Sequence, residues 1–168
     1  MRERSRDKSR LEDILKSIDN VRQYVENVTF EQFVSDTMRY YAIIKNVEIV
    51  GEAANMLTRH FQQLHPELPW RQIVGMRNVL VHGYANISDR QLWQTVNEDL
   101  PPMKQIINRY LAETNWDEWA KGDDIYSEID SAVYKKCIET AKNLKKMGLT
   151  VEQISDATGL TIKEVEDL

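Results

Sequence analysis

The sequence predicts an all-α protein, and three observations support this fold class. Apolar residues recur at steps of three and four positions along nearly the whole chain, which is the spacing of one face of an α-helix. Ser or Thr followed three residues later by Gln or Glu, a pattern typical of helix N-termini, occurs repeatedly. The chain of 168 residues has 6 Gly and 4 Pro, few for an architecture of strands and turns.

The first half of the chain predicts two substantial helices joined by a short one. The first has apolar residues at Leu11, Ile14, Leu15, Ile18, Val21 and Val25. Thr29 with Gln32 forms a capping box that predicts a short helical turn. Ser35 is the predicted N-cap of a long helix whose apolar residues step by four and three: Ile43, Val47, Val50, Ala54, Leu57 and Phe61. Such a seam is expected to pack on a partner helix.

Gly51 lies inside this long predicted helix. A glycine in a helix interior costs about 1 kcal/mol relative to alanine, so a packing reason for it is expected. We expect Gly51 to allow close approach of another helix.

A further helix is predicted from Pro69 or Trp70 to Val81 or His82, after the two prolines of "HPELPW". Its apolar residues surround almost the whole circumference, which predicts heavy burial: Ile73, Val74, Met76, Val79, Leu80 and Val81. Gly83 is the expected C-terminal stop. Ser88 with Gln91 predicts the start of the next helix, which Pro101 and Pro102 are expected to interrupt before a last helix from Met103 to about Leu111.

The predicted organisation is a helical domain over residues 1–112, an acidic linker over 113–127 and a helical C-terminal appendage over 128–168. Trp116 and Trp119 are unusual in a free linker, so part of it is expected to dock on another surface. In the appendage, a helix is expected to end at Gly148, and Thr150 with Gln153 and Thr161 with Glu164 predict two short helices. Their spacing is typical of a helix–turn–helix.

Charge and composition exclude several classes of protein. The net charge is −5. Residues 113–168, with 7 Lys and 13 Asp or Glu, carry −6, and residues 1–112 carry +1. Such a surface makes binding to duplex DNA unfavourable. A docking or oligomerisation role for the appendage is therefore preferred.

There is no membrane-spanning stretch and no secretory signal. The lone Cys137 is compatible with a cytoplasmic location, and His60 and His65 lack the neighbours of a metal site, so no metal or cofactor is expected.

Arg77 and Asn78 are polar residues inside an otherwise apolar helix. Arginine is almost never buried without a partner, because desolvation of its charge costs several kcal/mol. One interpretation is a structural ion pair, with Glu48 or Glu52 as the partner. The other is a guanidinium that binds a phosphate, for which its planar fork is suited. The residues alone leave both open.

His82 is expected in the last turn of the same helix, where the helix dipole favours its charged form. It could act as a general acid or base, or it could simply bond a carbonyl at the helix end. Arg77 and His82 are five residues apart, which corresponds to roughly 140° around a regular helix. A single helix would present them poorly to one small substrate. A cleft where two copies of the helix meet would bring an Arg and a His together.

The stretch "RNVLVHGY", from Arg77 to Tyr84, resembles the Arg-to-His motif of HEPN-domain ribonucleases, in which a polar residue, here Asn78, follows the arginine. In particular it resembles the Arg-x4-His-x-Tyr pattern of the HepT-like toxin family. Further segments read like that family in the same order: "LEDILKSID", "IIKNVEIVGEAA", "HPELPWRQIVGMRN" and "VNEDLPPMKQII". The resemblance covers about residues 8–112. It implies a HEPN-type antiparallel helical bundle that forms a homodimer or higher oligomer with two motif copies at a shared cleft.

The resemblance also implies a function. HepT-like proteins act as metal-independent endoribonucleases and toxins, usually neutralised by a minimal nucleotidyltransferase antitoxin. Arg77, Asn78 and His82 would then be catalytic, and Tyr84 would contact RNA and be the residue that the antitoxin adenylylates. Gly51, Glu48 and Glu52 would support the site structurally. The alternative is a non-catalytic helical subunit that binds a nucleotidyltransferase, with the motif intact but unused.

Overall fold

The protein is all-α, as predicted, and no strand occurs among the residues that the structure describes. The computed structural model describes residues 3–82, 88–122 and 124–168, and for residues 81, 82 and 124–131 it describes the backbone alone. The chain divides into two compact units, Met1–Lys121 (unit 1) and Gly122–Leu168 (unit 2). None of the described helices is long and apolar enough to cross a membrane.

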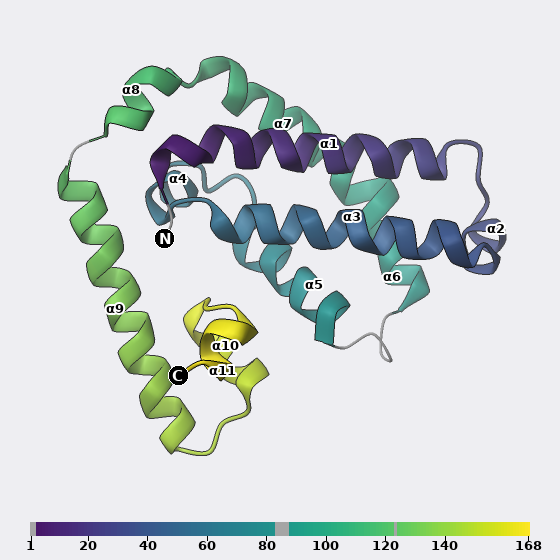
Figure 1. The fold of residues 1–168 in the computed structure, drawn as a ribbon. Coiled ribbons are helices and arrows are strands. Elements are labelled where there is room, and N and C mark those ends of the chain that lie inside the picture. Colours follow the sequence, from purple (N-terminus) through teal and green to yellow (C-terminus); the bar gives the residue numbers. More distant parts are fainter. Residues whose placement is uncertain (1–2, 83–87, 123) are drawn as a thin grey trace. The chain divides into compact units, whose positions relative to one another are not determined.

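The helices follow one another in this order (Figure 1): η1 Arg4–Arg6, α1 Asp7–Val25, α2 Phe30–Ser35, α3 Thr37–Met56, α4 Arg59–Leu64, α5 Trp70–His82, α6 Asp89–Gln94, η3 Thr95–Asp99, α7 Leu100–Glu113, α8 Trp116–Lys121, α9 Asp124–Lys146, α10 Val151–Thr158 and α11 Ile162–Glu166.

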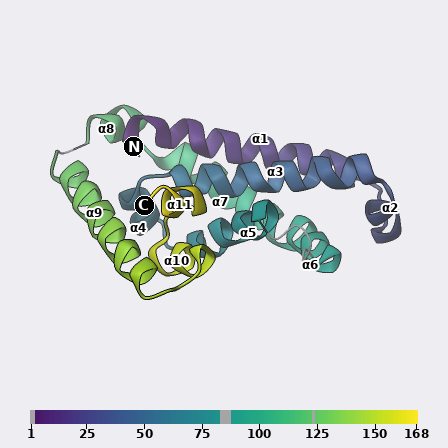
Figure 2. The same ribbon diagram turned by 60° about the horizontal axis from the view of Figure 1, so that its bottom comes forward.

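Unit 1 is built around α1 and α3, which run antiparallel, with α7 packed on α1 and α5 on α3 (Figures 1 and 2). The apolar seams predicted for the two long helices face each other. Leu11, Ile14 and Ile18 of α1 are fully buried, as is Ile43 of α3. Each such side chain contributes about 1.5–3 kcal/mol when it is removed from water, so this contact dominates the stability of unit 1.

Helix capping confirms most of the predicted starts and corrects one. Reciprocal capping boxes occur at Thr29, Thr150 and Thr161, and the Ser88 side chain accepts from the backbone N–H of Gln91. Ser35, however, does not cap the long helix. Its hydroxyl donates to the carbonyl of Gln32 at 3.3 Å, and it ends α2. Asp36 caps α3 instead, through a 3.0 Å bond from the backbone N–H of Arg39.

The long predicted helix does not run through to Phe61, because the chain breaks at Leu57 and Thr58. The buried carboxylate of Asp7 accepts the Thr58 backbone N–H at 2.9 Å and the Thr58 hydroxyl at 2.6 Å. Thr58 in turn caps α4 by accepting from the Phe61 N–H. The Ala54 carbonyl is satisfied by the Gln62 side chain at 2.8 Å. Leu57 and Phe61 remain fully buried, so the apolar pattern persists although the helix does not.

Asp7 is the most deeply buried charged residue in unit 1, with no exposed surface. It also accepts from the indole N–H of Trp119 at 3.1 Å and lies 3.4 Å from an Arg10 nitrogen. Burial raises the pKa of Asp7, and it outweighs the hydrogen bonds from Thr58 and Trp119 and the charge of Arg10, which lower the pKa. The folded protein therefore holds the Asp7 proton more tightly than the unfolded chain does.

Replacing Asp7 by Asn is expected to change how stability depends on pH. With a raised folded pKa, the stabilisation linked to Asp7 is complete below the unfolded pKa of about 3.9 and is lost as pH rises through the folded value. The variant lacks this titration. The unfolding free energy of the wild type minus that of Asp7→Asn should therefore shrink from about pH 4 to about pH 7 in urea titrations. A difference in unfolding free energy that grows with pH would contradict this. Asp13→Asn, at an exposed position of the same helix, is the control.

Pro101 and Pro102 were expected to interrupt the helix, and this prediction is wrong, because the helical path continues through them. They occupy the first turn of α7, where a missing N–H has no cost. The preceding residues Thr95–Asp99 form a π-helical segment that connects α6 to α7. A π segment inserts an extra residue into the helical path, and such segments occur frequently at functional sites.

Part of the predicted acidic linker is helical and docked, as Trp116 and Trp119 suggested. Both tryptophans of α8 pack on the core of unit 1. The Trp119 ring stacks on His60 at a centroid distance of 5.3 Å, and the guanidinium of Arg4 lies 4.6 Å from its centroid. The N-terminal segment and α8 are thus fastened to each other, and unit 1 extends beyond residue 112.

Unit 2 has its own small core, formed by Ala141 of α9 together with Ile154, Leu160 and Val165. Gly159 adopts a left-handed conformation with φ of 67° between α10 and α11, which gives the tight turn that the sequence predicted. Lys145 donates to the carbonyl oxygens of Val165 and Glu166 at the end of α11. These contacts define a compact helical hairpin on α9.

Candidate active site

Helices α3 and α5 approach each other most closely at Gly51. A Cβ atom placed on Gly51 would lie 2.3 Å from the Cβ of Arg77 and 3.1 Å from the carbonyl oxygen of Ile73. No side chain fits at the first of these distances. Gly51 therefore sets the spacing between the helices, and through it the position of Arg77.

Arg77 is held beside α3 by polar contacts on two sides. Its Nε lies 3.1 Å from Oε2 of Glu52, and its NH1 donates to Oδ1 of Asn78 at 3.1 Å. Of the two partners considered from the sequence, Glu52 forms the pair. Glu48 instead pairs with Lys45, at 2.9 Å between Nζ and Oε2. The guanidinium plane is thus oriented by its own neighbours.

The Arg77–Glu52 pair is partly buried. The Arg77 side chain is 18% exposed and that of Glu52 is 46% exposed, but the pairing oxygen, Oε2 of Glu52, is itself buried. A pair that solvent still reaches in part contributes on the order of 1 kcal/mol to stability. The pair is therefore a weak reason for placing an arginine here, although it accounts for the orientation of the guanidinium.

The heavy burial predicted for α5 is wrong for the single chain. Leu80 is buried, but Val79 is 49% exposed, and Val74 and Met76 are only partly covered. Among the described residues, leaving aside the helix's own backbone, nothing lies within 4 Å of a Cβ placed on Gly75. The apolar band of α5 is wider than its contact with α3. Within the described part of the chain, a strip that includes Gly75 and Val79, beside Arg77 and Asn78, is only partly covered.

His82 closes α5 as its last residue, so the backbone places it on the same helix as Arg77, as predicted. Its side chain lies outside the described part of the structure, and so do Gly83 and Tyr84. The regular helix from Trp70 to His82 preserves the five-residue spacing and hence the angle of roughly 140° between Arg77 and His82. The structure brings Arg77, Asn78, Gly51 and Glu52 together, and it connects His82 to them through the helix alone.

Within the described residues no group of three His, Cys, Asp or Glu side chains could hold a metal ion. His60 stacks on Trp119, and His65 packs against Phe61 and Tyr110 with centroid distances of 4.3 and 4.1 Å. Burial lowers the pKa of His65. Both histidines are parts of aromatic clusters.

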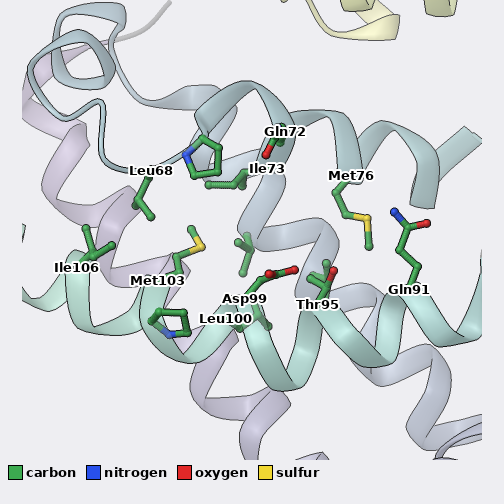
Figure 3. A pocket seen from close by; sticks show the side chains of 14 residues that line it. Leu68, Gln72, Ile73, Met76, Gln91, Thr95, Asp99, Leu100, Met103 and Ile106 are labelled. Atoms are coloured by element: carbon green, nitrogen blue, oxygen red, sulfur yellow. The ribbon is translucent and has the colours of Figure 1, made fainter.

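Sequence reasoning did not foresee a cavity of about 500 Å³ bounded by α3, α5, α6, η3 and α7 (Figure 3). Its floor includes Val47 and Val50, and Gln72, Gln91, Thr95 and Asp99 lie along it as polar groups. Its lining comes from three parts of the chain, within residues 47–50, 68–76 and 91–106, which only the packing of the helices brings together.

A helical bundle with an Arg-Asn-x3-His sequence at the end of a packed helix is the arrangement expected of the class of HEPN-like proteins. Comparison with known proteins specifies it further. A sequence model of the family described as "Ribonuclease HepT-like" matches residues 14–110. The chain belongs to this family.

Two relatives illustrate the match. "Probable ribonuclease HepT" of Thermococcus cleftensis is 40% identical over 97 residues, covering 58% of this chain and 88% of the relative. "Putative RNase MJ1380" of Methanocaldococcus jannaschii is 37% identical over 100 residues, covering 60% of this chain and 92% of the relative. No solved structure matches the chain significantly. The residues after 110 lie outside the family match.

Proposed function

We propose that the protein is a metal-independent endoribonuclease whose active site forms where two copies of α5 meet. The observation that carries this proposal is the placement of Arg77. It is a partly exposed arginine, oriented by Glu52 and Asn78, on the helix that His82 ends, in a chain of the ribonuclease HepT-like family. The chemical steps below need only these side chains.

In the proposed reaction, His82 of one copy takes the proton from a ribose 2′-hydroxyl. The 2′-oxygen attacks the adjacent phosphorus, and the bond from phosphorus to the 5′-oxygen breaks. The second copy's His82, in its charged form, gives a proton to the departing 5′-oxygen. The products are a 2′,3′-cyclic phosphate and a free 5′-hydroxyl. Arg77 stabilises the charge on the pentacoordinate phosphate, and Asn78 orients the guanidinium.

The experiment that tests this function compares RNA cleavage by the purified wild type and by His82→Ala in the presence of a chelator. The wild type should leave cyclic-phosphate ends, and His82→Ala should lose at least about 100-fold in rate, since a general acid–base group contributes that much. Equal rates for the two proteins would refute the proposal. A cleavage reaction that the chelator abolishes would refute its metal-independent form.

The two-fold arrangement is supported by the partly covered strip on α5. Val79 is 49% exposed, and Gly75 beside it leaves room for a second backbone to approach. Placing a charge in that strip would leave it buried and unpaired in a dimer, which costs several kcal/mol. Val79→Glu is therefore expected to convert a dimer to a monomer in sedimentation velocity and to lower cleavage with it. Leu64→Glu, at a 56% exposed site on α4, is the matched control. A dimer unaffected by Val79→Glu would argue against this interface.

We further propose that the protein is the toxin of a toxin–antitoxin pair and that a nucleotidyltransferase antitoxin neutralises it by adenylylating Tyr84. Tyr84 follows His82 by two residues, so a transferred AMP would add bulk and negative charge beside the site and repel RNA. Co-expression with such an enzyme should add the mass of AMP to the peptide that contains Tyr84. Unmodified peptide under those conditions would count against the transfer.

A further inference from the structure

The cavity between α5 and α7 has an apolar interior and a polar rim. Val50, Leu100 and Met103 are buried in its wall, while Gln72, Gln91 and Asp99 are exposed and Thr95 is half-buried. Gln72 and Met76 extend from α5, and Gln91 and Asp99 extend toward them from the opposite side (Figure 3). Small-molecule sites have this build: an apolar concavity with a few polar groups that fix orientation.

The rim groups are free to bind a ligand. None of the side chains of Gln72, Gln91, Thr95 and Asp99 forms a hydrogen bond or ion pair with another residue in the described part of the chain. The π-helical segment carries Thr95 and Asp99 on the same wall, with one extra residue per turn. Two amides, a hydroxyl and a carboxylate thus surround one opening.

The charge of the lining selects the chemical class of ligand. Among the described residues that line the cavity, Asp99 is the one charged side chain, and none is Lys or Arg. A phosphate or carboxylate would be repelled. A neutral, flat heterocycle with N–H donors fits better, because Asp99 accepts from such donors and glutamine amides both donate and accept. Met76 and Met103 supply the polarizable sulfur that packs favourably on aromatic rings.

We propose that this cavity binds one nucleobase of a single-stranded RNA substrate. The inference rests on the proposed ribonuclease function and adds to it the place where a base is held. Met76 precedes His82 by six residues, or about 9 Å along α5. A base in the cavity would hold the strand while an adjacent phosphate reaches the Arg77 and His82 end of the helix.

Methionine methyl resonances of the full chain give a direct test. Met76 and Met103 line the cavity, whereas Met38 and Met147 are 84% and 73% exposed elsewhere and serve as internal controls. Adenosine, guanosine, cytidine and uridine are titrated separately, with ribose 5-phosphate as the probe that lacks a base. At least one nucleoside is expected to shift Met76 and Met103 in a saturable manner without shifting the controls. The Gln72→Ala/Gln91→Ala double variant should weaken that binding about tenfold, and both sites are exposed, so folding is preserved.

Several outcomes would overturn the proposal. They are no shift with any nucleoside, equal shifts at Met38 and Met147, or an equal effect of ribose 5-phosphate. A shift of Met103, which is buried on α7, with protein concentration alone would show that a second copy fills the cavity, which also overturns the proposal; a shift of Met76 alone is expected from the dimer contact on α5. Because this readout needs no cleavage, it separates the two proposals. Cleavage without methyl shifts refutes the base site alone, whereas absent cleavage refutes the ribonuclease function whatever the methyl groups show.

Discussion

Replacement of Gly51 by alanine is expected to lower the unfolding free energy of unit 1 by about 2 kcal/mol or more. The added Cβ would meet the Cβ of Arg77 at 2.3 Å. A Cβ atom is fixed to its backbone and cannot rotate away, so α3 and α5 must move apart along their whole contact. The gain in helix propensity, about 1 kcal/mol, offsets only part of this cost. Thermal unfolding should shift down by about 8 °C.

Gly75→Ala is the matched control for this prediction. Gly75 also lies inside a helix, but nothing is within 4 Å of the added Cβ in the described structure. Both glycine variants are measured in the monomeric Val79→Glu background, so that the dimer contact proposed at Gly75 does not contribute. There, Gly75→Ala should stabilise the protein by about 0.5–1 kcal/mol through helix propensity alone. If both variants were equally stable in thermal or urea unfolding, the close packing of α3 on α5 at Gly51 would be wrong.

The helices of the core could be predicted because their signals are local. Periodicity placed α1, α3 and α5, and three capping boxes marked helix starts at Thr29, Thr150 and Thr161. Two errors were local, the choice of Ser35 over the neighbouring Asp36 as a cap and the break expected at the two prolines, whereas the largest one arose where a distant residue decides the backbone. The break at Thr58 depends on Asp7, which lies 51 residues earlier in the chain. No local pattern around residue 58 contains that carboxylate, so the apolar seam was extended through it.

The candidate site shows the same division between local and distant information. A mid-helix glycine predicted a close contact, and an arginine in an apolar helix predicted a partner. The choice of Glu52 over Glu48 needed the crossing geometry of α3 and α5, because both acids lie on the same helix one turn apart. The exposure of Val79 could not be predicted either. The sequence pattern of an apolar helical residue is the same whether the residue packs within its own chain or against another copy.

Arg77→Lys is expected to lower the rate of RNA cleavage about 100-fold while changing stability by less than about 1 kcal/mol. Lysine keeps the positive charge but loses the planar fork that can bind two phosphate oxygens and that Glu52 and Asn78 orient. Glu52→Gln should lower the rate less, about tenfold, since it releases the guanidinium from its position without removing it. Single-turnover rates at saturating RNA isolate the chemical step from binding.

A purely structural role for Arg77 predicts the opposite pattern, in which stability falls and cleavage below the melting temperature is unchanged. Arg109→Lys is the control, because Arg109 also pairs with a glutamate, Glu67, at 2.9 Å, far along the chain from the motif. The two glutamates are similarly exposed, at 45% and 46%, whereas Arg109 is more exposed than Arg77, at 48% against 18%. Arg109→Lys should change neither rate nor stability appreciably. The two pairs differ in what lies beside them. Of the two arginines, Arg77 lies on the helix that ends in His82 and Arg109 does not. A loss of rate in the variants of Arg77 and Glu52, with no loss in Arg109→Lys, would therefore assign the Arg77 guanidinium to catalysis. It would assign to the Glu52 carboxylate the role of holding that guanidinium in position.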